Sequence, residues 1–329
     1  MAEQVYSVSI CGRAILDLHS LNNEGGEGNQ ITTRMVNIIG EDNRLHQVNA
    51  ISGDMFKHIQ AEHLQRIAKQ NHLALCRGCQ EFNANRILAD TSFIESFKKA
   101  TPDREVIDML LKHCSQDDME GILITAQNKA LGRKSTVEFG WVAGVPELVT
   151  TDSYFHVKYV ADSGSLRDKE KEGKEKDASN LGQNIFHRPA SSGVYAVVVN
   201  LEAARIGYND ISQTYPISQQ ERTIRYQALL ESLLYTFLQP NGAMRNTQHP
   251  HLVNFEGAVV ISHKPVPAPT ISPINRNYRD QIQSISTTLN GLLKDKNAIE
   301  VKPFESLAGF AEELSLLSRK TQPLSLTRS

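Results

Sequence analysis

The chain has 329 residues, of which 40% are hydrophobic, and this is enough apolar material for a large buried core. No run of about 18 apolar residues occurs, and the start MAEQVYSVSI lacks a basic segment followed by an apolar one, so we expect a cytoplasmic protein with no membrane contact. The formal net charge of −2 argues against a uniformly basic nucleic-acid-binding surface, although lysines and arginines can still gather on one face.

The first third of the chain predicts strands around a turn, followed by a helix. Residues 5–18 alternate between two faces, as a strand does, and residues 31–40 predict a second strand. The segment 19–30 between them is rich in glycine and asparagine, which favours a turn. Residues 51–71 have helical spacing of apolar residues, with Ser52 suited to cap the amino end.

The middle of the chain predicts short helices, then strands and a charged arm. Helices are expected at 91–100 and 103–113, and strands within 135–149. Residues 162–184 hold almost no apolar side chains and many alternating charges. Because they have little surface to bury, we expect an exposed loop or arm there.

Regular apolar patterns return in the last part of the chain. The segment VYAVVVNL within 193–206 predicts a buried strand, and 257–263 predicts another. Ser218 and Glu221 have capping-box spacing at the start of a helix that is expected to end near Gln239. Residues 276–318 form a final amphipathic region. Two β-α-β halves can therefore be drawn, which predicts an α+β fold with a ferredoxin-like, or RRM-like, sheet.

Several motifs resemble one known family. The string CGR occupies Cys11–Arg13, SLNNEGGEGN occupies residues 20–29, and NAISGDMFKHIQAEHL occupies residues 49–64. PNGAMR follows at residues 240–245, with Pro250–His251 after it. Together these segments resemble the DevR family of CRISPR-associated proteins, whose superfamily forms the repeated backbone of type I Cascade, and a type I-B-like complex is the nearest match.

The resemblance implies how the chain is divided. It predicts an RRM-like palm from residues 1–66 and 191–275, a helical finger insertion at 67–154 and a β-hairpin thumb at 155–190. A C-terminal helical region, 276–329, is expected to pack on the palm. The resemblance also implies that copies pack head to tail along a crRNA, each thumb displacing a guide base. Other partners would be target DNA and the hook, large and small Cascade subunits.

A protein that holds any guide sequence must grip phosphate and sugar rather than base edges. Glycine-rich turns and helix amino ends present backbone N–H groups for this purpose, and nearby cations neutralise phosphate. The predicted RNA-binding residues are Arg13, Asn22, Gly25, Gly26, Gly28, Asn29, Arg34, Ser52, Gly53, Lys57, His58, Phe186, His187, Gly242, Ala243, Met244 and Arg245.

Each of these segments also has a plainer interpretation. Gly/Asn clusters are commonly ordinary turns, Ser52 can be a simple helix cap, and 242–245 can be a helix stop. Phe186 and His187 are candidates to wedge between bases, because base-stacking aromatic residues are missing from the expected strands. They can equally anchor the base of a hairpin.

The residues leave two other functions open. Asp17, Glu24 and Glu27 can bind Mg²⁺ and orient water, as in the RNA-cutting backbone subunits of type III complexes. The type I relatives that the chain resembles more closely are not nucleases, so no catalytic residue is expected. A transcriptional or developmental regulator is the third possibility, but no helix-turn-helix with a basic recognition helix is evident.

The cysteines raise the question of a metal. His72, Cys76, Cys79 and Cys114 contain one C-x-x-C pair, which suits zinc. A second cysteine or histidine pair of regular spacing is missing, so the sequence favours unrelated cysteines, and no metal or other cofactor is expected.

Overall fold

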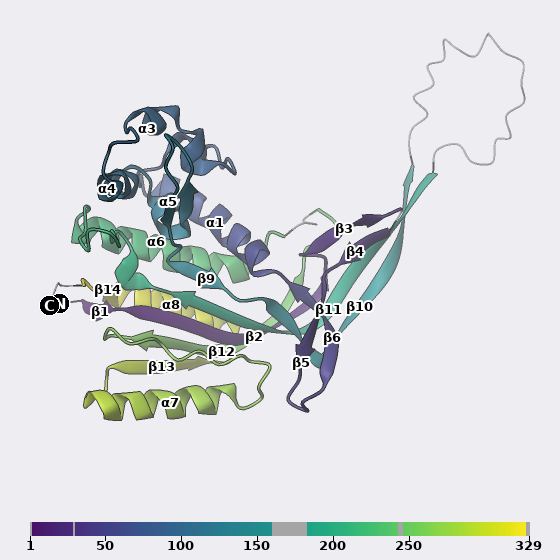
Figure 1. Cartoon of the computed structure of the whole chain (residues 1–329). Helices are drawn as coiled ribbons and strands as arrows, with labels where there is room; N and C mark the ends of the chain where they lie inside the picture. Colours follow the sequence, from purple (N-terminus) through teal and green to yellow (C-terminus); the bar gives the residue numbers. More distant parts are fainter. Residues whose placement is uncertain (1, 29, 160–182, 243–245, 327–329) are drawn as a thin grey trace, which may run out of the picture.

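The computed structural model describes residues 2–28, 30–159, 183–242 and 246–326. Its main feature is a ten-stranded sheet that is almost entirely antiparallel (Figure 1). The path through the sheet runs β13 (Ile299–Phe304), β12 (His251–Ser262), β2 (Ser7–His19), β11 (Gln183–Leu201), β10 (Val142–Tyr159), β6 (Leu45–Ile51) and β5 (Met35–Ile39). A further strand, β9 (Val137–Phe139), pairs with the last residues of β11.

Helices cover both faces of the central strands. α1 (Gly53–Gln70), α6 (Gln219–Leu238) and α8 (Leu307–Lys320) lie on one face, and α7 (Tyr278–Leu293) lies on the other (Figure 1). The alternation of β2 explains this, because Ile10 packs in the core under α1, α6 and α8 while Cys11 packs with α7. The central strands are therefore buried on both sides.

The predicted helix starts are confirmed. Ser52 accepts a hydrogen bond from the Met55 amide (3.2 Å), and Ser218 accepts one from the Glu221 amide (3.2 Å). The Glu221 carboxylate completes no capping box, because it pairs with Arg225 one turn later. Both caps satisfy amides that the helix itself leaves without a partner.

A separate helical unit, defined by the elements from α2 to β8, stands over α1 and α6 (Figure 1). It contains α2 (Arg77–Gln80), η1 (Arg86–Ala89), α3 (Thr91–Glu95), α4 (Asp103–His113), α5 (Ser115–Glu120), β7 (Ile122–Ile124) and β8 (Leu131–Arg133). This unit has its own apolar core. The helix expected at 103–113 is confirmed, whereas the one expected at 91–100 ends at Glu95, because the chain turns at Ser96 and again at Thr101.

A two-stranded arm extends from the sheet (Figure 1). Its described part is the ladder of β10 and β11 from Val149↔Gly193 to Tyr159↔Gln183, so the boundary expected at residue 154 falls within β10. A bulge marks the base of the arm, where Gly193 has φ +147° and a Cβ would lie 2.2 Å from the Leu148 carbonyl oxygen. Only glycine fits this bend.

The expected turn at 19–30 is instead largely a hairpin. β3 (Asn23–Glu27) pairs with β4 (Gln30–Thr33), and β4 touches β11 beside the arm (Figure 1). The single strand expected at 31–40 is likewise divided into β4 and β5. The break is at Arg34, whose amide binds the Asn22 carbonyl and whose carbonyl binds the Ala50 amide, so the chain changes partners there.

The C-terminal region is only partly helical. Between α7 and α8 it contributes β13, which forms the edge of the large sheet by pairing with β12. The strand was not predicted, because the amphipathic pattern of 276–318 continues without a break from the residues before the strand to those after it.

The two ends of the described chain meet where β1 (Glu3–Val5) pairs in parallel with β14 (Thr321–Pro323). A short η2 helix (Ala203–Arg205) follows β11. None of the described helices combines the length and apolarity needed to cross a membrane.

Candidate nucleic-acid interface

Two segments that carry the family resemblance meet in space although they are far apart in the sequence. Gly242 packs on Leu21 so closely that a Cβ at Gly242 would lie 2.5 Å from the Leu21 Cδ2 atom. Asn241 is buried beside it. The loop after α6 therefore lies against the start of the β3–β4 hairpin. Asn29 and residues 243–245, including Arg245, are outside the described residues.

Asn22 and Ser52 join this hairpin to the amino end of α1. The Asn22 Oδ1 atom accepts hydrogen bonds from the Ser52 amide (3.2 Å) and the Ser52 hydroxyl (2.9 Å). Gly53 follows, and its Cα faces β9, since a Cβ there would lie 2.5 Å from the Phe139 carbonyl oxygen. The Asn22 side chain is thus buried in the fold, where it holds the hairpin on the helix.

A cation and an aromatic ring lie next to this junction. The Arg34 guanidinium lies 5.4 Å from the centre of the Trp141 ring and 2.5 Å from a Glu24 oxygen. Trp141 is 47% exposed, so about half of the surface of a large aromatic side chain remains open to solvent. A cation beside an open ring is the combination that binds phosphate and stacks on a base.

Lys57 is held from three sides. Its ammonium donates to the Val137 carbonyl (2.9 Å) and the Ser135 hydroxyl, and lies 3.5 Å from the Glu120 carboxylate. Glu120 is buried, and burial raises the pKa of its carboxyl group. Lys57 is therefore partly exposed to solvent and at the same time pairs with the buried Glu120 carboxyl group.

Two hollows run along α1 and share Asp54 and Lys57, and we call them together the α1 groove. One, of about 290 Å³, lies between the amino end of α1 and the segment from Val137 to Trp141. The other, of about 340 Å³, lies between α1 and the helical unit. Its lining includes His58, Phe82 and Arg86. The His58 and Phe82 rings are in contact, with centres 5.5 Å apart. The groove thus has an aromatic group and a cation near each end.

The structure brings together Asn22, Arg34, Ser52, Gly53, Lys57 and His58, all at or near the amino end of α1. Arg13 lies apart from them. Its Nε atom donates to the Pro273 carbonyl (2.8 Å), and its guanidinium lies over Tyr278 of α7 on the opposite face of the sheet. Arg13 is therefore part of the packing of α7.

The glycines and the aromatic pair of the arm occupy different places. Gly25 and Gly28 have positive φ angles, and a Cβ at either position would have no atom within 4 Å, so the tip of the hairpin is open. His187 is exposed on the arm, with its ring 5.8 Å from that of Phe155. Phe186 is paired with His156 in the backbone ladder.

The acidic residues considered for catalysis belong to β2 and β3. Glu24 is paired with Arg34, whereas Asp17 lies within β2 opposite His251. Glu27 is the last residue of β3.

Trp141, Phe82 and Arg86 belong to the groove but were not predicted from the sequence. Trp141 is the only tryptophan of the chain, and it is flanked by glycine in FGWVAG, which was a usable signal. Phe82 and Arg86 carry no such signal. They reach the groove because α2 and η1 fold back over α1, and this is decided by tertiary packing.

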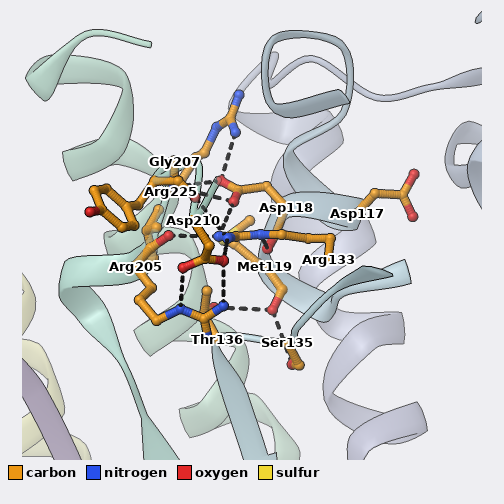
Figure 2. Close-up of polar contacts among 12 residues, drawn as sticks. Asp117, Asp118, Met119, Arg133, Ser135, Thr136, Arg205, Gly207, Asp210 and Arg225 are labelled. Atoms are coloured by element: carbon orange, nitrogen blue, oxygen red, sulfur yellow. Dashed lines mark hydrogen bonds and ion pairs between the residues drawn. The ribbon is translucent and has the colours of Figure 1, made fainter. Parts of the chain in front are cut away.

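An arginine network fixes the helical unit above the groove (Figure 2). Asp118 of α5 accepts hydrogen bonds from Arg133 (2.7 Å) and Arg225 (2.8 Å), and all three side chains are buried (Figure 2). Arg225 belongs to α6, so the network ties the unit to the helices on the sheet. Asp210 and Arg205 extend it toward solvent.

The chain is similar to several known proteins. The chain is 24% identical to "CRISPR-associated protein Cas7/Cst2/DevR" of Methanocaldococcus jannaschii over 322 residues, which cover 93% of this chain and 95% of that protein. A structure described as "CRISPR RNA-guided surveillance complex, pre-nicking" has a chain that is 10% identical, with a TM-score of 0.48 and coverage of 98% of this chain and 96% of that one. Csc2 of Thermofilum pendens has 10% identity and a TM-score of 0.39, with 95% and 86% covered. The family model "CRISPR-associated negative auto-regulator DevR/Csa2" matches residues 10–283, and the chain therefore belongs to the DevR/Csa2 family of CRISPR-associated proteins.

Proposed function

We propose that this chain is a non-catalytic backbone subunit of a CRISPR complex that binds crRNA along its sugar-phosphate chain. Copies would pack head to tail on the guide and present it for pairing with target DNA, together with hook, large and small subunits. Family membership and the name of the archaeal relative, which carries the Cas7 designation, support this role.

The strand order supports an RRM-like palm. The strands β12, β2, β11 and β9 are neighbours in that order and are antiparallel throughout. With α1 between β2 and β9 in the chain, and α6 between β11 and β12, this order agrees with the β-α-β-β-α-β connection that the proposed palm requires. Under this proposal the α1 groove lies at the edge between palm and helical unit.

One observation carries the RNA-binding proposal. Arg34, Trp141 and Lys57 come from three separate segments, yet they meet at the amino end of α1. This set combines a guanidinium, an ammonium and a half-exposed indole ring beside a helix amino end, which suits phosphate and unstacked bases without selecting a sequence. The arm extends away from the sheet (Figure 1), and under this proposal it would contact a neighbouring copy.

The direct test is binding of the purified chain to two guide-length RNAs of unrelated sequence. Similar affinity for both, falling steeply as salt is raised, is expected from phosphate contacts. Particles of regular spacing along the RNA in electron micrographs would support head-to-tail packing. Binding restricted to one promoter duplex would instead favour a regulator. Cleavage of a complementary RNA by the assembled complex with Mg²⁺ would favour the nuclease alternative.

Variants at the groove sharpen the test. Trp141→Ala removes the stacking surface, and loss of one base–aromatic contact is expected to weaken RNA binding about tenfold or more. Arg34→Gln is expected to weaken binding and reduce its salt dependence. Arg319→Gln, at the exposed end of α8, is the matched control and should bind like the parent chain. Equal affinity of all three variants would refute the assigned site.

A further inference from the structure

Four potential metal ligands meet in the core of the helical unit. Cys76 and Cys79 belong to the start of α2, and Cys114 and Asp117 belong to the start of α5. One ligand atom from each lies within 4.8 Å of every other, and all four residues are buried. Such a set of soft donors with a carboxylate is unusual for an apolar core, where polar groups are buried only with partners.

The two halves of the cluster have the same local geometry. Cys76 caps α2 and its sulfur accepts a hydrogen bond from the Cys79 amide (3.4 Å). Cys114 caps α5 and its sulfur accepts one from the Asp117 amide (3.4 Å). In each half, the second ligand follows the capping cysteine after two residues. These amide hydrogen bonds favour thiolate, which is the form of cysteine that binds metal.

The distances within the cluster fit a tetrahedral ion. The Asp117 Oδ2 atom lies 3.4 Å from the Cys76 sulfur and 3.6 Å from the Cys79 sulfur. Tetrahedral ligands with Zn–S near 2.3 Å and Zn–O near 2.0 Å lie about 3.5 Å apart. These two sulfur–oxygen distances are those that a zinc ion bound by both cysteines and Asp117 requires.

The Arg86 guanidinium lies beside the Asp117 carboxylate. The other oxygen of Asp117, Oδ1, is buried without a hydrogen bond and lies 3.5 Å from the Arg86 Nε atom. Figure 2 shows Asp117 pointing away from the arginine network that holds Asp118. The guanidinium would offset part of the negative charge that three thiolates and a carboxylate leave around a divalent cation.

We propose that Cys76, Cys79, Cys114 and Asp117 bind one structural zinc ion. Three sulfurs and one oxygen complete a four-coordinate site, and all ligands are buried, as in closed structural sites. An iron–sulfur cluster is disfavoured because such clusters are normally held by four cysteines. Zinc would join α2 to α5 and so stabilise a small unit whose own core is limited.

This reverses the interpretation that the sequence favoured. Among the described residues His72 is not part of the cluster, and no second cysteine or histidine pair joins it. The second pair is Cys114 with Asp117, which has the same two-residue spacing but ends in a carboxylate.

The test is the metal content of the full-length chain, purified without chelator from cells grown with added zinc. We expect about one zinc per chain. After replacement by Co²⁺, the visible spectrum should have the bands of tetrahedral cobalt with thiolate ligands. A folded chain that contains no zinc under these conditions, or that contains iron instead, would overturn the proposal.

Variants identify the ligands. Cys76→Ser and Cys114→Ser should lose most of the zinc, whereas Asp117→Cys should retain it because it completes a four-cysteine site. Cys11→Ser is the matched control, since Cys11 is a buried cysteine of β2 outside the cluster. Loss of zinc from the control, or full zinc in both serine variants, would contradict the assignment. If the serine variants do not fold, the parent chain and the Asp117→Cys variant still decide.

Discussion

Asp117 and Asp118 are consecutive residues of α5, yet their carboxylates point in opposite directions (Figure 2). Asp117 faces the three cysteines inside the helical unit, and Asp118 faces Arg133 and Arg225. One short helix therefore supplies both the interior of the unit and its attachment to α6. The contact of Asp118 with Arg225 of α6 therefore anchors the helical unit over the α1 groove.

Asp118 should be critical for stability. In Asp118→Asn, the buried arginines Arg133 and Arg225 lose their shared carboxylate, and an uncompensated buried charge costs about 3–5 kcal/mol. Denaturant unfolding followed by circular dichroism measures the change. Asp210→Asn is the control, because Asp210 is half exposed and its pairs should contribute less than about 1 kcal/mol. Equal effects of the two changes would contradict the prediction.

His19 should make stability depend on pH. Burial lowers the pKa of its ring to about 4 from the usual 6.5, because the charged form is poorly solvated beside Tyr195. The folded-state pKa is thus below the unfolded one, so the contribution is complete above about pH 6.5 and is lost as the pH falls toward 4. Between about pH 7.5 and pH 5 the loss is about 2 kcal/mol.

The measurement compares the free energy of unfolding at these two pH values in the parent chain and in His19→Phe. The variant should lack this part of the pH dependence, while His249→Phe, at an exposed position, should retain it. Identical pH profiles for the parent and His19→Phe would show that the ring is not buried in its neutral form.

Lys57 should contribute to stability as well as to binding. Lys57→Met leaves the buried Glu120 carboxyl without its cation, and we expect a loss of about 2 kcal/mol in unfolding free energy. Adding Glu120→Gln should recover part of the loss, because the charge that needs Lys57 is gone. Lys134→Met is the control at an exposed ion pair. A double variant no more stable than the single one would argue against coupling of the two groups.

Gly193 should be required at the base of the arm. Gly193→Ala forces a φ of +147° on alanine and places a Cβ 2.2 Å from the Leu148 carbonyl oxygen. We expect a loss of about 2–3 kcal/mol, measured by thermal or denaturant unfolding. Gly132→Ala is the control, because no atom lies within 4 Å of a Cβ at that position. Near-equal stability of the two variants would mean that the arm bends elsewhere.

Local features were predictable from the sequence. Ser52 and Ser218 cap helices, and Asp103 to His113 is helical as expected, because these features depend on residues a few positions apart. The resemblance found in residues 11–29, 49–64 and 240–251 pointed to the family that the family model confirms. Which strands pair with one another was harder to predict from the sequence. The hairpin of β3 and β4 was expected to be a turn, because glycine and asparagine favour turns unless another strand pairs with them.

The helix starts, the α+β character and the family could be predicted from the order of the amino acids, because each depends on short, nearly contiguous patterns. Which side chains share a site depended instead on how the whole chain folds. Folding brought Trp141 to Arg34, placed Arg13 on the opposite face of the sheet, and joined Cys114 and Asp117 to Cys76 and Cys79. The physical reason is that such neighbours come from separate segments, and their contact depends on how strands pair and how helices pack across the whole chain.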